Sequence, residues 1–99
     1  MSTPINDPEK AAKVFADDRA NVFHSWSAQA QISPMAIAGG AGSYFWDFTG
    51  KKYLDFSSQL VFTNIGHQHP KVISAIKEQA DVLTTIAPQH ANEARNEAA

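Results

Sequence analysis

The sequence predicts a mixed α/β chain in which helices flank a small antiparallel sheet. Three stretches carry this prediction: an amphipathic helix over about 8–23, a β-hairpin over 43–56 and a second amphipathic helix over 70–83. Aromatic and β-branched residues crowd both arms of the hairpin, and such residues suit a pleated, half-buried surface. Because a lone two-stranded hairpin is marginally stable in water, we expect this one to pack onto a larger structure.

The hairpin turns at Asp47-Phe48-Thr49-Gly50. Asp at the first position and Gly at the fourth are typical of a type I turn. The Asp47 carboxylate can accept hydrogen bonds from backbone N–H groups further along, and Gly50 tolerates the positive φ that leads out of the turn. We therefore expect this segment to be structural.

Both predicted helices have a start signal and one apolar face. Asp7 before Pro8 is a typical N-cap, and Pro70 fits the first turn of the second helix. The apolar residues recur about every 3.6 positions, which indicates a packing face on each helix. These residues are Ala11, Val14, Phe15, Val22 and Phe23, then Val72, Ile73, Ile76, Ala80 and Leu83. Asn92 is interpreted as the N-cap of a last helix.

Two stretches look at first like ligand sites. The run Gly39-Gly40-Ala41-Gly42 resembles a phosphate loop, but a phosphate loop opens a helix and this run opens a strand. We interpret it as a flexible turn. His67 and His69 could share one face of a strand and bind zinc, yet the spacing offers no third ligand and Pro70 follows at once. We interpret this second stretch as structural and predict no metal.

Asp47 and Asp55 could form a general acid/base pair. The turn accounts for Asp47, and a hydrogen bond to neighbouring backbone accounts for Asp55. Neither carboxylate is predicted to be catalytic.

Composition argues against several classes of function. The chain is 43% hydrophobic with a net charge of −2, which is ordinary for a globular protein. Its basic residues are scattered rather than clustered, which argues against nucleic-acid binding, and no run approaches the roughly 18 apolar residues of a membrane span. The absence of cysteine excludes thiolate metal sites and a Cys nucleophile. We expect a cytoplasmic protein that binds neither nucleic acid nor membrane.

The order of the motifs resembles a known enzyme family. Gly-Ser-Tyr-Phe-Trp-Asp at 42–47, Gly-Lys-Lys-Tyr-Leu-Asp at 50–55 and Asn-Ile-Gly-His-Gln-His-Pro at 64–70 are similar to the amino-terminal part of class III aminotransferases. The resemblance runs from about His24 to Ala99. It implies fold type I, the aspartate-aminotransferase-like α/β fold of enzymes that depend on pyridoxal 5'-phosphate, and it implies a homodimer.

The resemblance divides the chain into three parts. Residues 1–24 would form an N-terminal arm and its helix, 25–90 the first part of the small domain, and 91–99 the start of a helix leading into the large domain. Because that last helix breaks off without a stop signal, we expect an N-terminal piece of a longer chain. No lysine here matches the family's cofactor lysine, so no catalytic or cofactor-binding residue is predicted within the 99 residues.

The resemblance also implies one wall of a substrate pocket. Leu60 and Val61 follow the Tyr-Leu-Asp strand where the family has a Leu-Trp pair beside the substrate, and Trp26 lies in a segment similar to the family's His-Pro-aromatic-Thr. Together with Ile86, these residues are expected to line the amino-donor pocket, and Val61 in place of Trp implies extra room. Alternatively, Leu60, Val61 and Phe62 form a buried strand and Trp26 is an apolar anchor.

The implied function is transamination, in which pyridoxal phosphate carries an amino group from an amine or ω-amino acid to a keto acid such as pyruvate. Two alternatives stay open. One is another fold-type-I pyridoxal-phosphate enzyme, such as an aminomutase or a racemase. The other is an autonomous, non-enzymatic binding module that uses exposed Tyr44, Trp46 and Trp26.

Overall fold

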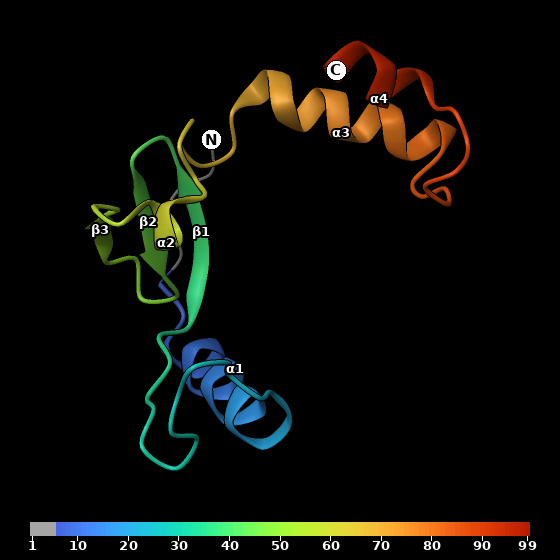
Figure 1. The fold of residues 1–99 in the computed structure, drawn as a ribbon. Coiled ribbons are helices and arrows are strands. Elements are labelled where there is room, and N and C mark those ends of the chain that lie inside the picture. The colour runs from blue at the N-terminus through green and yellow to red at the C-terminus, as the bar shows by residue number, and fades with distance from the viewer. Residues whose placement is uncertain (1–5) are drawn as a thin grey trace. The chain divides into compact units, whose positions relative to one another are not determined.

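The computed structural model describes residues 6–99, in which a three-stranded antiparallel sheet lies in a first compact unit that ends at His69 (Figure 1). The predicted hairpin is confirmed as β2 (Tyr44–Asp47) and β3 (Lys52–Leu54). A further strand, β1 (Ile37–Ala41), pairs antiparallel with β2, so the sheet order is β1-β2-β3. Residues 1–5 of the predicted arm lie outside the described residues, and the three-part domain division stays a prediction.

Strand β1 corrects the prediction of a flexible turn at 39–42. Gly39 and Gly40 are paired strand residues, although glycine is depleted in strands. Tertiary contacts explain the choice, because a Cβ on Gly39 would lie 3.0 Å from the Trp46 indole and one on Gly40 would lie 3.1 Å from the His67 ring. Glycine therefore makes room here for two rings, and the sequence pattern alone does not show them.

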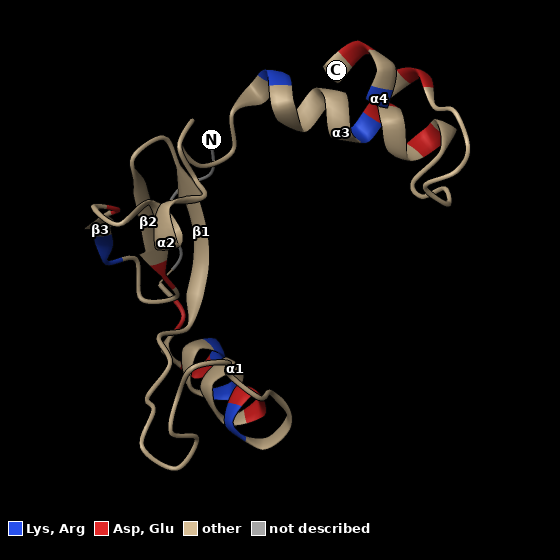
Figure 2. Cartoon of the chain, viewed as in Figure 1, with Lys and Arg blue, Asp and Glu red and all other residues tan. Residues whose placement is uncertain are grey.

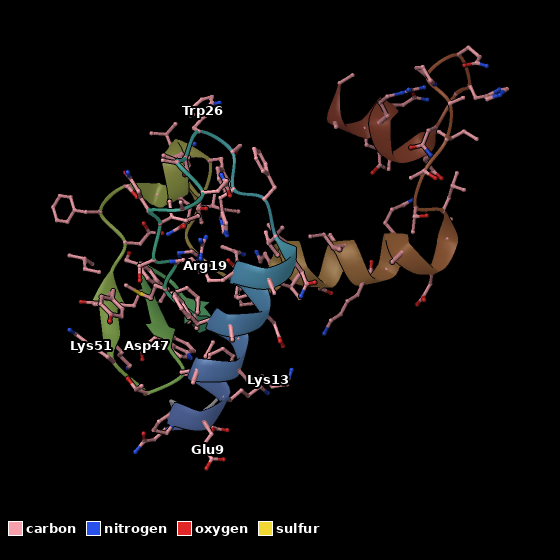
Figure 3. The ribbon with its side chains drawn as sticks, turned by 90° about the horizontal axis from the view of Figure 1, so that it is seen from below. Glu9, Lys13, Arg19, Trp26, Asp47 and Lys51 are labelled. Carbon is pink, nitrogen blue, oxygen red and sulfur yellow. The ribbon has the colours of Figure 1, made fainter. Side chains whose placement is uncertain are left out.

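The predicted hairpin turn is confirmed, with Asp47 at its first position, where the Asp47 carbonyl accepts a hydrogen bond from the Gly50 N–H at 3.2 Å (Figure 3). One oxygen of its carboxylate accepts hydrogen bonds from the backbone N–H groups of Thr49, at 2.9 Å, and Lys51, at 3.1 Å. The other accepts from the Tyr53 hydroxyl at 3.0 Å. The hydrogen bond from the Thr49 side chain is the main reason that the pKa of Asp47 is lowered. Gly50 has a φ of 87°, in the left-handed region that glycine favours.

The first helix, α1 (Pro8–Asn21), begins as predicted and is attached to the hairpin at its start. The Asp7 carboxylate accepts a hydrogen bond from the Lys10 backbone at 3.0 Å, which is an N-cap. The Asp7 N–H in turn donates to the Phe48 carbonyl at 2.6 Å. Phe48 and Trp46 are the buried hydrophobic residues of the described chain. The hairpin thus supplies the core, and the helix start is joined to it through the backbone.

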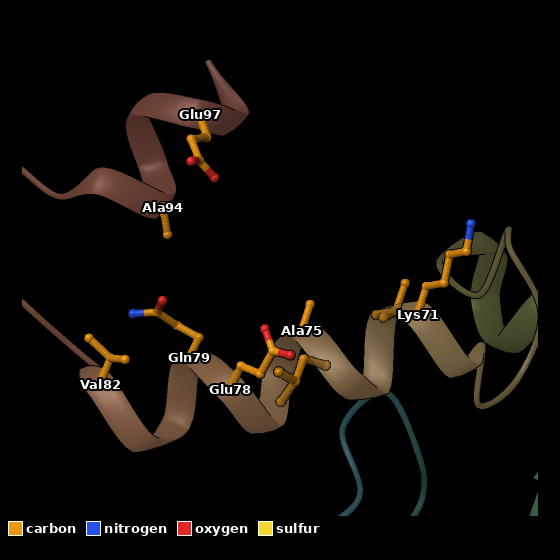
Figure 4. Close-up of a pocket in the computed structure, with 9 residues that line it drawn as sticks. Lys71, Ala75, Glu78, Gln79, Val82, Ala94 and Glu97 are labelled. Atoms are coloured by element: carbon orange, nitrogen blue, oxygen red, sulfur yellow. The ribbon is translucent and has the colours of Figure 1, made fainter.

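The second unit, Pro70–Ala99, contains α3 (Pro70–Val82) and α4 (Glu93–Ala98). Both predicted helices are confirmed, and the Asn92 side chain accepts a hydrogen bond from the Arg95 backbone at 3.1 Å as an N-cap should. Within this unit, α3 and α4 border a groove of about 640 Å³ (Figure 4). Val82 and Ala94 belong to its lining.

Charged residues of both signs interleave along the helices rather than gathering into one basic stripe (Figure 2). In the described residues, no helix combines the length and the apolar character that crossing a membrane requires.

The turn between β1 and β2 is joined to a distant segment. Gly42 and His67 form an isolated antiparallel bridge, with N–H···O distances of 3.0 Å and 2.8 Å. The neighbouring Gly66 has a φ of 84°, and a Cβ placed on it would lie 2.9 Å from the Gly42 carbonyl oxygen. Two backbones therefore approach each other here as only glycine allows.

Gly66→Ala should therefore destabilise the protein more than Gly42→Ala does. Both glycines have positive φ, but a Cβ at Gly42 would meet nothing within 4 Å. An alanine at either position costs about 1–2 kcal/mol for the left-handed backbone, and overpacking at Gly66 should add roughly 1–3 kcal/mol. Equilibrium denaturation of both variants measures the difference. Equal losses for the two alanines would show that the close approach is not rigid.

Candidate functional site

The predicted pocket residues Leu60 and Val61 lie on a left-handed turn, α2 (Ser58–Val61). Its four φ angles, from Ser58 to Val61, are 50°, 51°, 61° and 67°. Each left-handed L-residue costs roughly 1–2 kcal/mol, and a positive φ is a clear outlier for a β-branched side chain. The alternative of a buried strand at 60–62 is wrong, because Leu60, Val61 and Phe62 are 75–76% exposed and none is in a strand.

Asp55 is hydrogen-bonded to this turn through Gln59. Its side chain is only 4% exposed. One carboxylate oxygen accepts a hydrogen bond from the Gln59 side chain at 3.1 Å and lies 2.6 Å from His67 Nε2. The other oxygen has a longer contact, 3.4 Å, with the Gln59 backbone N–H. The predicted backbone partner for Asp55 is thus only the weakest of its contacts, and the sequence analysis missed the two side-chain partners.

These hydrogen bonds keep Asp55 ionised. The Gln59 side chain, and then His67, hold the pKa of the Asp55 carboxyl below its ordinary value, although burial opposes them. The His67 ring is itself fixed, since it packs edge-on against Phe45 with centroids 6.3 Å apart. Phe45 in turn stacks on Tyr53 at 5.3 Å. An aromatic layer of the sheet therefore sets the position of the histidine that orients Asp55.

Three backbone hydrogen bonds close the turn itself, one of them from the Phe62 N–H to the Ser58 carbonyl. The Val61 N–H donates to the Ser57 carbonyl and the Thr63 N–H to the Ser58 carbonyl, each at 3.0 Å. A small hollow of about 90 Å³ lies beside the turn, bordered by Asp55 and His67 among others. The turn is thus held by a network of polar contacts, while its apolar side chains face outward.

The third predicted pocket residue, Trp26, lies on the loop after α1 (Figure 3). His24 connects the loop to the helix, because its Nε2 lies 2.6 Å from Asp18. Within the loop, the His24 backbone N–H donates to the Gln29 side chain at 2.9 Å. Trp26 has a φ of 56° and is 98% exposed. It therefore anchors no core within residues 6–99.

Ile86, the fourth predicted residue, belongs to the second unit. It is 47% exposed and follows α3, where it borders a hollow of about 170 Å³ with Leu83 and Arg95. Of the four predicted residues, the structure joins Leu60 and Val61 on one turn. A pocket shared by all four stays a prediction.

Within residues 6–99, no lysine is placed as an imine-forming lysine must be. Such a lysine needs a buried site that lowers its pKa. All six are exposed: Lys10, Lys13, Lys51, Lys52, Lys71 and Lys77. Within residues 6–99 no three His, Asp or Glu side chains are grouped so as to hold a metal ion. The described residues therefore do not fit the cofactor's own attachment site, and the pocket wall stays a prediction.

Comparison with known proteins assigns the family. The model of the class III aminotransferase family matches residues 26–99. The chain belongs to the class III aminotransferases. It is 48% identical over 50 residues to an acetylornithine aminotransferase of Methanocaldococcus jannaschii, covering 50% of this chain and 13% of that protein. It is 47% identical over 51 residues to the mitochondrial ornithine aminotransferase of Rattus norvegicus, covering 52% and 12%.

Solved structures agree with this assignment. This class III chain is similar to a taurine:2-oxoglutarate aminotransferase from Bifidobacterium kashiwanohense in complex with PLP and glutamate, with a TM-score of 0.81 and 39% identity over 88% of this chain and 19% of that one. An S-selective transaminase from Arthrobacter sp. with alanine bound gives 0.79 and 31% over 89% and 19%. The predicted fold class is confirmed as part of fold type I. The chain spans about an eighth of the length of the curated relatives described above.

Acid should weaken the contact between Asp55 and its partners. The pKa of folded Asp55 is lowered. The stability that it contributes is therefore complete above the unfolded pKa of about 3.9 and is lost as the pH falls through the folded pKa. Asp55→Asn should lower the denaturation midpoint at pH 7, and lower it less near pH 3. Asp81→Asn, the same change at an exposed position of α3, serves as the control. An equal loss at both pH values would contradict the ionised state.

Proposed function

We propose that the full-length protein is a pyridoxal-phosphate-dependent transaminase that moves an amino group from an amine or ω-amino acid to a keto acid. The family match over residues 26–99 carries the proposal. The relatives include enzymes for ornithine, acetylornithine, 5-aminovalerate and taurine. These compounds share a primary amine at the end of a short chain, which supports an ω-amino donor. Pyruvate as the acceptor and a cytoplasmic location stay predictions.

When bound, pyridoxal phosphate supplies the electron sink for amino-group transfer, and the protein supplies binding, orientation and electrostatics. Because all six lysines of this chain are exposed, we assign the cofactor lysine to a part of the protein outside residues 1–99. We also propose that the protein is a homodimer, as the family resemblance implies. The role left for this chain is to shape the substrate pocket.

The wall of that pocket is proposed to consist of Leu60 and Val61, with Trp26 and Ile86 contributing from other segments. The support is physical: apolar side chains point outward from a strained turn, and backbone strain of this kind concentrates at functional sites. An apolar wall discriminates between substrates by roughly 1–3 kcal/mol per methylene. We therefore expect this wall to set donor preference rather than the rate of chemistry.

The binding-module alternative loses one of its three residues, because Trp46 is 5% exposed and lies in the core. An aminomutase or a racemase would differ from a transaminase in needing no keto acid acceptor. Dependence of turnover on an added keto acid therefore separates these enzymes.

The first functional prediction concerns the cofactor. The full-length protein should bind pyridoxal phosphate, and borohydride reduction should fix the cofactor to one lysine. Peptide mass spectrometry of the reduced protein should locate that pyridoxyl-lysine outside residues 1–99, since the lysines within them are exposed. A reduced protein without any pyridoxyl-lysine would overturn the proposed function. A modification at Lys51 or Lys71 would overturn the division of roles.

The second functional prediction concerns the pocket wall. Val61→Trp should lower kcat/KM for a bulky aryl amine relative to 5-aminovalerate by about tenfold or more, because the added ring fills the extra room. Val61→Leu should shift the same ratio in the same direction, but less. Val22→Trp, at the end of α1, is the control for inserting a large ring elsewhere. A ratio unchanged in Val61→Trp, with the cofactor still bound, would remove Val61 from the pocket.

A further inference from the structure

The left-handed turn Ser58–Val61 has no glycine, and its conformation must be imposed by contacts. The backbone hydrogen bonds that close it, from Val61, Phe62 and Thr63, are of kinds that other tight turns also form. The contacts that single out this conformation are those made by the Gln59 backbone and side chain to Asp55. Asp55 therefore lies where it can decide which way the turn presents its side chains.

Asp55 is also linked rigidly to the sheet. Its backbone N–H donates to the Ser43 carbonyl at 2.8 Å, and its carboxylate lies 2.6 Å from His67 Nε2. His67 is bridged to Gly42 through its own backbone. The β1–β2 turn is thus connected to Asp55 twice, at Ser43 through the Asp55 backbone and at Gly42 through His67. Because Asp55 contacts Gln59 of the turn directly, a movement of Asp55 would move the turn.

We propose that Asp55 is a positioning residue for donor selectivity, which it exerts with His67 and Gln59 by fixing the turn that carries Leu60 and Val61. The inference rests on the proposed function, since it concerns the same pocket wall. Asp55 touches neither substrate nor cofactor in this role. Releasing the turn would let Leu60 and Val61 relax toward a less strained backbone. Amino donors would then contact a pocket wall of different shape.

The hairpin offers a matched control for this role. Asp47 is a second carboxylate with several hydrogen bonds and a lowered pKa, but it holds the turn at the opposite end of β3. Asp47→Asn and Asp55→Asn should therefore both reduce stability. Only the change at Asp55 should alter the position of Leu60 and Val61.

The experiment compares kcat/KM for 5-aminovalerate and 1-phenylethylamine, with pyruvate as acceptor, in the full-length holoenzyme and its variants. Asp55→Asn and His67→Leu should each shift the ratio of the two values by about five- to tenfold. His67→Gln, which restores an N–H donor toward Asp55, should return the ratio to within about twofold of the wild type. Asp47→Asn should leave the ratio unchanged while lowering the melting temperature.

The outcomes separate the inference from the proposed function. A wild-type holoenzyme that transfers no amino group from either donor overturns the proposed function and this inference with it. An active wild type in which Asp55→Asn shifts the ratio no more than Asp47→Asn overturns the positioning role alone. If Asp55→Asn does not fold, the pair His67→Leu and His67→Gln decides, and equal ratios in that pair also overturn the role.

Discussion

The contact between Asp55 and His67 is the interaction on which the first unit depends. Hydrophobic burial alone is small here, since Trp46 and Phe48 are its buried apolar residues. The carboxylate joins the end of β3, the left-handed turn and the segment bridged to Gly42. A buried polar network of this kind is valuable only when its members are satisfied, and an unpaired charge at its centre would be strongly destabilising. Each partner in the network therefore helps to fix the position of the Asp55 carboxylate.

The sequence predicted those parts of the fold that depend on local chemistry. The caps at Asp7 and Asn92 and the turn from Asp47 to Gly50 each satisfy backbone groups within a few residues, so pattern and position suffice. Strand β1 was not predicted, because its glycines are required by aromatic rings from other segments that pack against them. The left-handed turn was not predicted either, because nothing in Ser-Gln-Leu-Val favours positive φ, and only its contacts impose it.

The candidate site divides in the same way. The resemblance to a family pointed to Leu60 and Val61, and the structure places both on one turn. The support beneath them was missed, because Asp55 and His67 lie 12 residues apart and their pairing needs the sheet to be in place. One signal was present in the close succession of Asp55, Gln59 and His67 around an apolar run. Alone, that pattern does not distinguish a polar clamp from three solvated side chains.

The strain in the turn also bears on whether these residues act alone. Four left-handed residues cost about 4–8 kcal/mol together, which is comparable with the whole stability of a typical domain at about 5–15 kcal/mol. Three backbone hydrogen bonds, each contributing about 1 kcal/mol net, offset only part of this. Leu60 and Val61 are 76% and 75% exposed, so their packing within the first unit adds little. We therefore expect the turn to be stabilised by apolar packing against the rest of a larger enzyme, which favours the proposed pocket wall over an autonomous module.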